Sequence, residues 1–109
     1  MSKQTKRAAA PLTREQLLER IKRPLIQREI EGVGIVRFRR LSAEQRYTLQ
    51  AYASDNMAFA ARAIIAGFEE PKFLLEDEAA LKAGAFGPVM AMSQAVLEDT
   101  EVTEDELVK

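Results

Sequence analysis

Residues 32–49, GVGIVRFRRLSAEQRYTL, join two sequence patterns that together decide the fold of this chain. The first pattern alternates β-branched and aromatic residues with arginines, which is typical of a strand with one buried face. The second places Gln45 three residues after Ser42, and this spacing forms the capping box with which many helices begin. We therefore expect a strand followed directly by a helix, with Val36 and Phe38 buried and the arginines on the opposite face.

The preceding residues predict a partner for this strand. Ile26, Arg28 and Ile30 alternate with polar residues, and a Gly-Val-Gly turn follows them. Two alternating runs around a glycine-containing turn are typical of a β-hairpin. The sequence therefore predicts antiparallel strands near residues 25–31 and 34–40.

A short helix is expected before the hairpin. Thr13 and Gln16 have the spacing of another capping box, and Pro24 ends the helix because proline disfavours helical geometry in the residue before it. Residues 1–11 are basic, and we expect them to form a flexible tail. The predicted apolar face of the helix consists of Leu17, Leu18 and Ile21, with Leu12 packing on Leu17.

Residues 43–66 have helical character throughout, but Ser54 and Asp55 in their middle are residues that cap new helices. The pattern therefore permits one bent helix or two. Gly67 follows the last apolar residues at a position where glycine often ends a helix, so we expect the helix to stop there.

The C-terminal half predicts further short elements. An extended piece at residues 73–75 should precede a helix that begins with the acids 76–78 and ends at Gly84. A last long helix should have Pro88 at its first position, and Thr103 with Glu106 forms a third capping box. The predicted fold is α+β and mostly α: a small antiparallel hairpin within residues 25–40, followed by a compact bundle of about four helices. Residues 12–109 would form one domain.

The composition argues against an enzyme. The 109 residues include no Cys and no His, so thiolate chemistry, the usual zinc ligands and a Ser-His-Asp triad are missing. Neither glycine-containing stretch, GVG or GAFGP, has the residues of a nucleotide-binding loop. We expect no catalytic, cofactor-binding or metal-binding residues. We also expect no membrane span, because no apolar run approaches the roughly 20 residues that one requires, and a cytoplasmic location.

Charge is divided unevenly along the chain. Residues 1–50 hold 12 basic and 5 acidic residues, whereas residues 51–109 hold 4 basic and 12 acidic residues. Such asymmetry fits either nucleic-acid binding by the basic half or attraction between the halves, within one chain or between copies; the sequence favours attraction. Arg37, Arg39 and Arg40 can accordingly form a solvated strand face, a face for a protein partner or a second copy, or a nucleic-acid contact.

Methionine and alanine dominate the apolar residues of the second half. Methionine side chains adapt to helical partners, and they also fill cores. A chain with few large apolar residues can in addition complete its core by self-association. If a partner-binding groove exists, we expect it among Met57, Phe59, Ile64, Ile65, Val89, Met92 and Val96, with Arg37, Arg39 and Arg40 at its rim or in a self-association face.

The strand-to-helix corner resembles a protein family. Residues 36–46, VRFRRLSAEQR, are similar to the segment of phage tail assembly chaperones in which a strand of alternating apolar residues and arginine leads to Leu-Ser/Thr and a capped helix. The order of elements after this corner is similar too, so the resemblance covers roughly residues 25–108. Its motifs are patterns of residue class.

The resemblance implies a function in the assembly of long-tailed (siphovirus-type) phages. Such chaperones bind the long helical tape-measure protein in the cytoplasm of the infected bacterium and keep it soluble until tail-tube subunits polymerise around it. They are absent from the mature virion, they self-associate, and many have a longer frameshifted form. The alternative from the residues alone is a small nucleic-acid-binding regulator that uses the basic N-terminal half.

Overall fold

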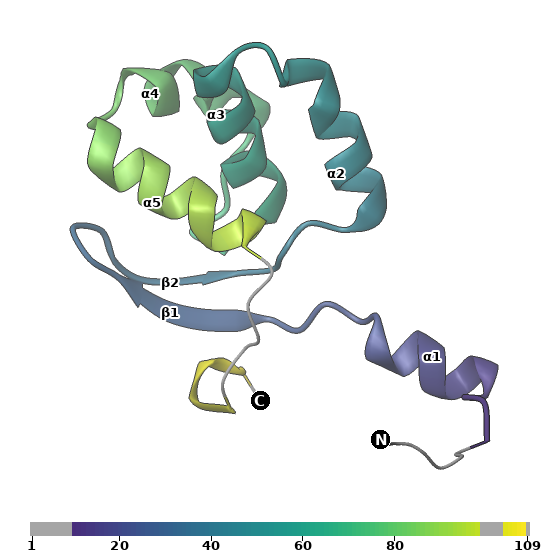
Figure 1. Ribbon diagram of the computed structural model, residues 1–109. Helices are drawn as coiled ribbons and strands as arrows, with labels where there is room; N and C mark the ends of the chain where they lie inside the picture. The colour runs from purple at the N-terminus through teal and green to yellow at the C-terminus, as the bar shows by residue number, and fades with distance from the viewer. Residues whose placement is uncertain (1–9, 99–103, 109) are drawn as a thin grey trace, which may run out of the picture.

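The computed structural model describes residues 10–98 and 104–108 (Figure 1). Most of the expected tail at residues 1–11 and the expected cap at Thr103 therefore lie outside the described residues. The elements, in chain order, are α1 (Arg14–Arg20), β1 (Ile26–Ile30), β2 (Gly34–Phe38), α2 (Ala43–Leu49), the 3₁₀ turn η1 (Gln50–Tyr52), α3 (Asn56–Gly67), β3 (Phe68–Glu70), η2 (Leu75–Asp77), α4 (Glu78–Ala83), α5 (Phe86–Leu97) and η3 (Glu104–Glu106). This arrangement confirms the predicted α+β, mostly helical fold.

The hairpin forms as the alternation predicts. β1 and β2 pair antiparallel, with Ile26 opposite Phe38, and the turn contains Gly32 in a positive-φ conformation that other residues rarely adopt. Val36 and Phe38 are buried beneath the helices, as expected. The sheet gains a third strand, β3, which pairs antiparallel with β2 to give the order β1-β2-β3.

Helices α3 and α5 cover the inner face of the sheet, and α4 packs beside α3 (Figure 1). The core lies between these helices and the sheet. Its largest side chains are Phe38 and Phe68, which stack with their ring centroids 5.9 Å apart. Phe73 meets Phe68 edge-on at 5.7 Å, so these aromatic rings connect the sheet to the segment before α4.

Strand β3 is a feature that the sequence did not predict. The expected extended piece at residues 73–75 lies after it, and Leu75 begins the 3₁₀ turn η2. A three-residue strand has too short a pattern to be recognised. It forms because Phe68 lies opposite Phe38 in the sheet and buries its ring in the core.

The region of residues 43–66 consists of two helices. Ser42 and Gln45 form the expected capping box at the start of α2, and the Asp55 side chain accepts a hydrogen bond from the Ala58 N–H to begin α3. The short turn η1 lies between them. The sequence allowed either one bent helix or two. The new cap at Asp55 begins a second helix, so there are two.

Helix α3 ends at Gly67, where the sequence predicted a stop, and this glycine is the last helical residue and has no positive φ. A side chain there would meet Val96 Cγ1 at 2.6 Å and the Arg39 carbonyl oxygen at 2.9 Å, so close packing requires glycine. The expected helix start with Pro88 in the first position is wrong: α5 begins at Phe86, after Ala85 in the N-cap position, and Pro88 is its third residue.

Helix α1 projects away from the sheet and the other helices (Figure 1). Its capping box between Thr13 and Gln16 is present, as predicted, and none of its residues is buried. The apolar face therefore exists without anything packed on it within the described part of the chain. Leu12, Leu17, Leu18 and Ile21 are between 42% and 66% exposed.

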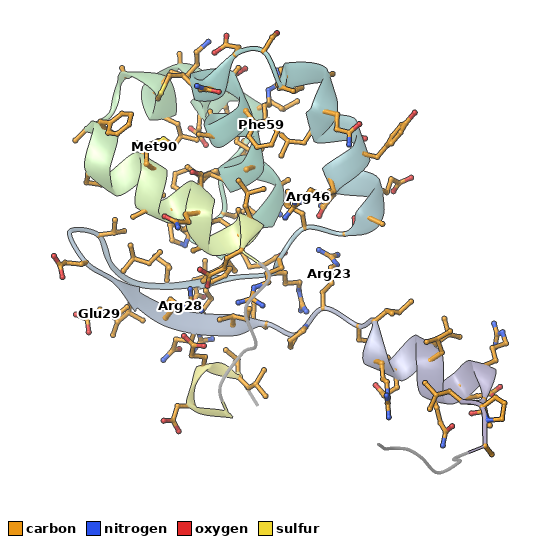
Figure 2. The ribbon with its side chains drawn as sticks, in the orientation of Figure 1. Arg23, Arg28, Glu29, Arg46, Phe59 and Met90 are labelled. Carbon is orange, nitrogen blue, oxygen red and sulfur yellow. The ribbon has the colours of Figure 1, made fainter. Side chains whose placement is uncertain are left out.

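The segment around η3 lies against the outer edge of β1. Leu107 forms a β-bridge with Ile26, and the Val108 N–H donates to the Leu25 carbonyl at 3.0 Å. Arg28 of β1 reaches this segment from beneath the helices and donates to Glu106 at 2.7 Å (Figure 2).

Candidate functional site

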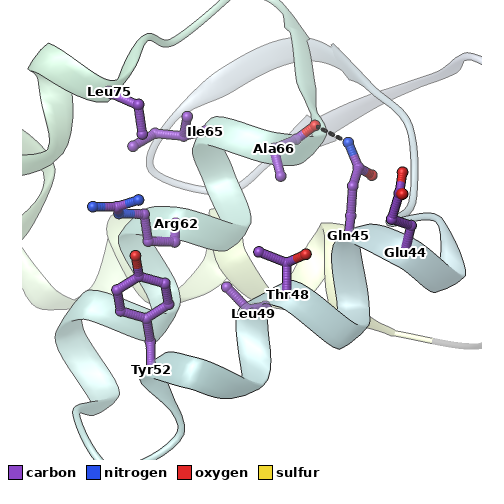
Figure 3. A pocket seen from close by; sticks show the side chains of 9 residues that line it. All are labelled: Glu44, Gln45, Thr48, Leu49, Tyr52, Arg62, Ile65, Ala66 and Leu75. Atoms are coloured by element: carbon purple, nitrogen blue, oxygen red, sulfur yellow. Dashed lines mark hydrogen bonds between the residues drawn. The ribbon is translucent and has the colours of Figure 1, made fainter.

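A groove between α2 and α3 is the candidate binding site in the described part of the chain. Its volume is about 320 Å³. Leu49, Ile65 and Ala66 provide an apolar floor, and Leu75 of η2 extends it (Figure 3). The complete lining is Glu44, Gln45, Thr48, Leu49, Tyr52, Arg62, Ile65, Ala66 and Leu75.

Gln45 closes one end of the groove. Its side-chain oxygen accepts from the Ser42 N–H at 3.0 Å and from Arg23 Nη1 at 3.2 Å, while its amide nitrogen donates to the Ala66 carbonyl at 3.4 Å (Figure 3). One side chain therefore caps α2, ties it to the end of α3 and holds the segment that precedes β1. These contacts fix the separation of the two helices at this end.

Tyr52 and Arg62 form the other end. The Arg62 guanidinium lies over the Tyr52 ring, 4.7 Å from its centroid, and donates to Glu78 at 3.1 Å. The hydrogen bond to Glu78 raises the pKa of the Arg62 guanidinium, so this residue remains charged at all ordinary pH values. The charge is matched by Glu78 and by the electron-rich ring face beneath it.

The groove has the chemistry of a binding surface for an apolar helix. Its floor is aliphatic, while its polar groups stand at the two ends and along α2. Helix-in-groove recognition uses this arrangement, in which apolar residues spaced three or four apart on the ligand enter an apolar channel. Among the described residues, no cluster of three or more acidic side chains is placed to hold a metal ion.

The structure places most of the predicted groove residues elsewhere. Ile64, Val89, Met92 and Val96 are at most 8% exposed and belong to the core beneath α3 and α5, so the expectation of a groove among them is wrong. The physical reason is that α3 and α5 pack directly on each other. Met57 and Phe59 are half-buried against the same core, and Ile65 alone of the seven lines the groove.

The three predicted arginines lie on β2 and at the corner after it, and none lines the groove. Arg37 donates to Gln27 at 3.0 Å, and Arg39 donates to the Arg23 carbonyl at 2.6 Å. Each of the three also forms an ion pair with an acid of the second half of the chain. The pairs are Arg37 with Glu70, Arg39 with Glu69, and Arg40 with Glu98.

Arg28 strengthens this link between the two halves. It pairs with Glu98 at the end of α5 as well as with Glu106, and its side chain is only 22% exposed. Hydrogen bonding to Glu106 raises the pKa of the Arg28 guanidinium, against a smaller opposing effect of burial. The uneven charge along the sequence thus serves attraction within one chain, one of the forms of attraction that the sequence allowed.

Sequence reasoning missed most of the groove. The signal was nevertheless present in the helical spacing. The positions i, i+3, i+4 and i+7 are occupied by Gln45, Thr48, Leu49 and Tyr52, which therefore share one face of α2 and its 3₁₀ extension. That face mixes polar with apolar residues, so it does not resemble a core stripe. Leu75 could not be placed from sequence, because only the fold brings η2 to α3.

No helix in residues 10–98 or 104–108 combines the length and the apolar character that crossing a membrane requires. Comparisons with models of protein families, with curated proteins and with solved structures found no match to this chain. The fold is that of an α+β domain, and the groove between α2 and α3 has an aliphatic floor with polar groups at both ends.

Proposed function

We propose that this protein is an assembly chaperone that binds a helical client through the groove between α2 and α3. The groove itself carries the proposal: Ile65 and Ala66 of its floor are half-buried, Leu75 beside them is exposed, and its ends are held by Gln45 and by the Tyr52–Arg62 pair. A client helix would place apolar residues on Ile65, Ala66 and Leu75. A small apolar surface of this kind favours reversible binding, which a chaperone requires in order to release its client.

The resemblance of residues 36–46 to phage tail assembly chaperones supplies the identity of the client. We propose the tape-measure protein of a long-tailed phage, bound in the cytoplasm of the infected bacterium and released when tail-tube subunits assemble. The chaperone would then be absent from the finished virion. Tape-measure proteins are long and helical, so they present repeated apolar stripes of the kind that the groove fits.

Co-expression with the tape-measure protein tests this proposal. The chaperone should raise the soluble fraction of the client, and Thr48→Arg should abolish the effect because it places a long charged side chain in the groove. Thr48 is exposed, so the substitution should leave the fold intact. Tyr47→Arg is the matched control, since Tyr47 is 77% exposed on the opposite side of the same helix. Equal precipitation of the client with and without the chaperone would refute the proposal.

The nucleic-acid alternative has a separate test. Binding through phosphate contacts weakens steeply with salt, because it releases counterions. Arg37, Arg39 and Arg40 already pair with acids of the same chain, which lowers their attraction for phosphate. Tight, salt-dependent binding of single- or double-stranded nucleic acid by the purified protein would favour the regulator over the chaperone.

A further inference from the structure

We infer that the groove between α2 and α3 receives helix α1 of a second copy of this chain, so that two copies exchange their N-terminal helices. This inference rests on the proposed role of the groove as a helix acceptor, and it does not depend on the identity of the client. It would make α1 an internal competitor for the site.

The first reason is that α1 has no buried residue within the described part of its own chain. The helix has seven residues, none of them buried. Isolated helices shorter than about 12–15 residues are marginal in water even when their sequences favour helix. The capping box satisfies backbone groups at one end, but an apolar partner is what ordinarily stabilises an amphipathic helix of this length. A surface that covers its apolar stripe would therefore stabilise α1.

The second reason is the match between the helix and the groove. Arg14, Leu17, Leu18 and Ile21 occupy positions i, i+3, i+4 and i+7, so they form one stripe along α1. This is the spacing of anchor residues in helix-in-groove complexes. The aliphatic floor of the groove offers the complementary surface.

Charge also matches between the two surfaces. The stripe on α1 includes one cation, Arg14, whose ion pair with Glu15 is long at 3.8 Å and joins side chains that are 79% exposed. The groove lining includes one carboxylate, Glu44, that forms no ion pair within the described part of the chain. A docked α1 can bring Arg14 toward Glu44.

The third reason explains why the occupant is a second copy. Arg23 is held at the strand-to-helix corner, because its carbonyl accepts from Arg39 Nη1 at 2.6 Å and its own Nη1 donates to the Arg40 carbonyl at 2.9 Å (Figure 2). Only Ile21 and Lys22 separate this anchor from the last residue of α1. The anchored chain directs α1 away from the body that carries the groove, as Figure 1 shows. Exchange between two copies requires no change at this anchor. It buries both helices in two equivalent contacts related by a two-fold axis.

Sedimentation over a concentration range tests the exchange. The wild-type protein should pass from monomer to dimer between about 1 μM and 1 mM, as a small reversible interface predicts. The double variant Leu17→Asp with Ile21→Asp should weaken dimerisation at least about tenfold without loss of the core fold, because neither residue is buried. Phe86→Asp is the matched control: Phe86 is 70% exposed, it belongs neither to the α1 stripe nor to the groove lining, and an acid suits its place in the first turn of α5. A wild-type protein that stays monomeric throughout, or a Leu17→Asp/Ile21→Asp variant that still dimerises like wild type, would overturn the inference.

A synthetic peptide of residues 12–23 provides the second measurement. A fluorescent form should bind the monomeric Leu17→Asp/Ile21→Asp variant, and Thr48→Arg added to that variant should abolish the binding. Undiminished binding after Thr48→Arg would place α1 elsewhere and overturn the inference. Failure of this peptide to bind, together with preserved solubilisation of the client, would overturn the exchange while leaving the proposed function standing.

Disulfide trapping locates the contact directly. The chain has no cysteine, so single cysteines introduced at Ile21 and at Leu75 in separate molecules can form only the intended heterodimer or the two homodimers. Mild oxidation of the mixture should give mainly the heterodimer. A cysteine at Ile35, which is 68% exposed on the outer face of the sheet, is the control for random collision. Equal yields with Ile35→Cys and with Leu75→Cys would contradict the proposed seat of α1.

Discussion

Helices α1 and α2 have the same length and the same kind of capping box, but they contribute differently to the stability of the molecule. Each has seven residues and begins with a hydroxyl residue and a glutamine that form a complete capping box. In α2, the glutamine also bonds to α3, and Leu49 enters the core. In α1, none of the residues is buried, and among the described residues its side-chain ion pairs join Arg14 with Glu15 and Glu19 with Lys22. The comparison shows that a capping box determines where a helix begins, whereas tertiary contacts determine what the helix adds to stability.

The largest difference in the free energy of unfolding is expected between leucine substitutions in the two helices. Leu49→Ala removes a side chain that is 3% exposed, and we expect it to lower the free energy of unfolding by about 2–5 kcal/mol because it leaves a cavity. Leu17→Ala should change it by less than about 0.5 kcal/mol, because this side chain is exposed on a projecting helix. Urea denaturation at a concentration where the protein is monomeric measures both. Equal losses would show that α1 is part of the cooperative fold.

The packing at the end of α3, to which α2 is tied by Gln45, offers the next test. Gly67→Ala should destabilise the protein by about 1–3 kcal/mol, because the new methyl group would meet Val96 and the Arg39 carbonyl in a packed core. Gly87→Ala is the matched control in α5, where a methyl group would meet nothing within 4 Å apart from its chain neighbours. It should change the free energy of unfolding by less than about 1 kcal/mol, because the higher helix propensity of alanine is offset by the restriction that Pro88 places on the residue before it. Thermal denaturation should therefore show a clear loss only for Gly67→Ala, and a neutral Gly67→Ala would contradict the close packing.

The smallest effects are expected at the two caps themselves. Ser42→Ala should lower the free energy of unfolding by about 1 kcal/mol, because the cap belongs to a helix that is coupled to the core. Thr13→Ala should leave the global transition within about 0.5 kcal/mol of wild type and should reduce only the helical circular dichroism signal of α1. If Thr13→Ala shifts the global transition as much as Ser42→Ala does, the two helices do not differ in the way described.

Local sequence was sufficient for the hairpin and the helix starts. The alternation around Val36 and Phe38 depends on strand geometry alone, and the boxes at Thr13 and Ser42 depend on backbone groups within four residues. Such features carry their signal in adjacent residues. They were therefore predicted, and the structure confirms them.

Features that depend on distant contacts could not be predicted. Strand β3 exists because Phe68 stacks on Phe38, and Gly67 is required because Val96 lies against it. The prediction of the groove residues was wrong for the same reason. Helical spacing marks Ile64 and Val96 as apolar-face residues, but only the packing of α3 on α5 shows that this face is interior and that the open groove lies on the other side, toward α2.

The bridge between Ile26 and Leu107 has a consequence for the behaviour of the protein in concentrated solution. A sheet edge with unpaired backbone groups is a template on which further chains can add as strands, and this is a common origin of aggregation. Residues 104–108 occupy part of the β1 edge, and the ion pair between Arg28 and Glu106 holds them there. A chain truncated before residue 104 would leave that edge open and should precipitate, whereas additions at the N-terminus leave it covered.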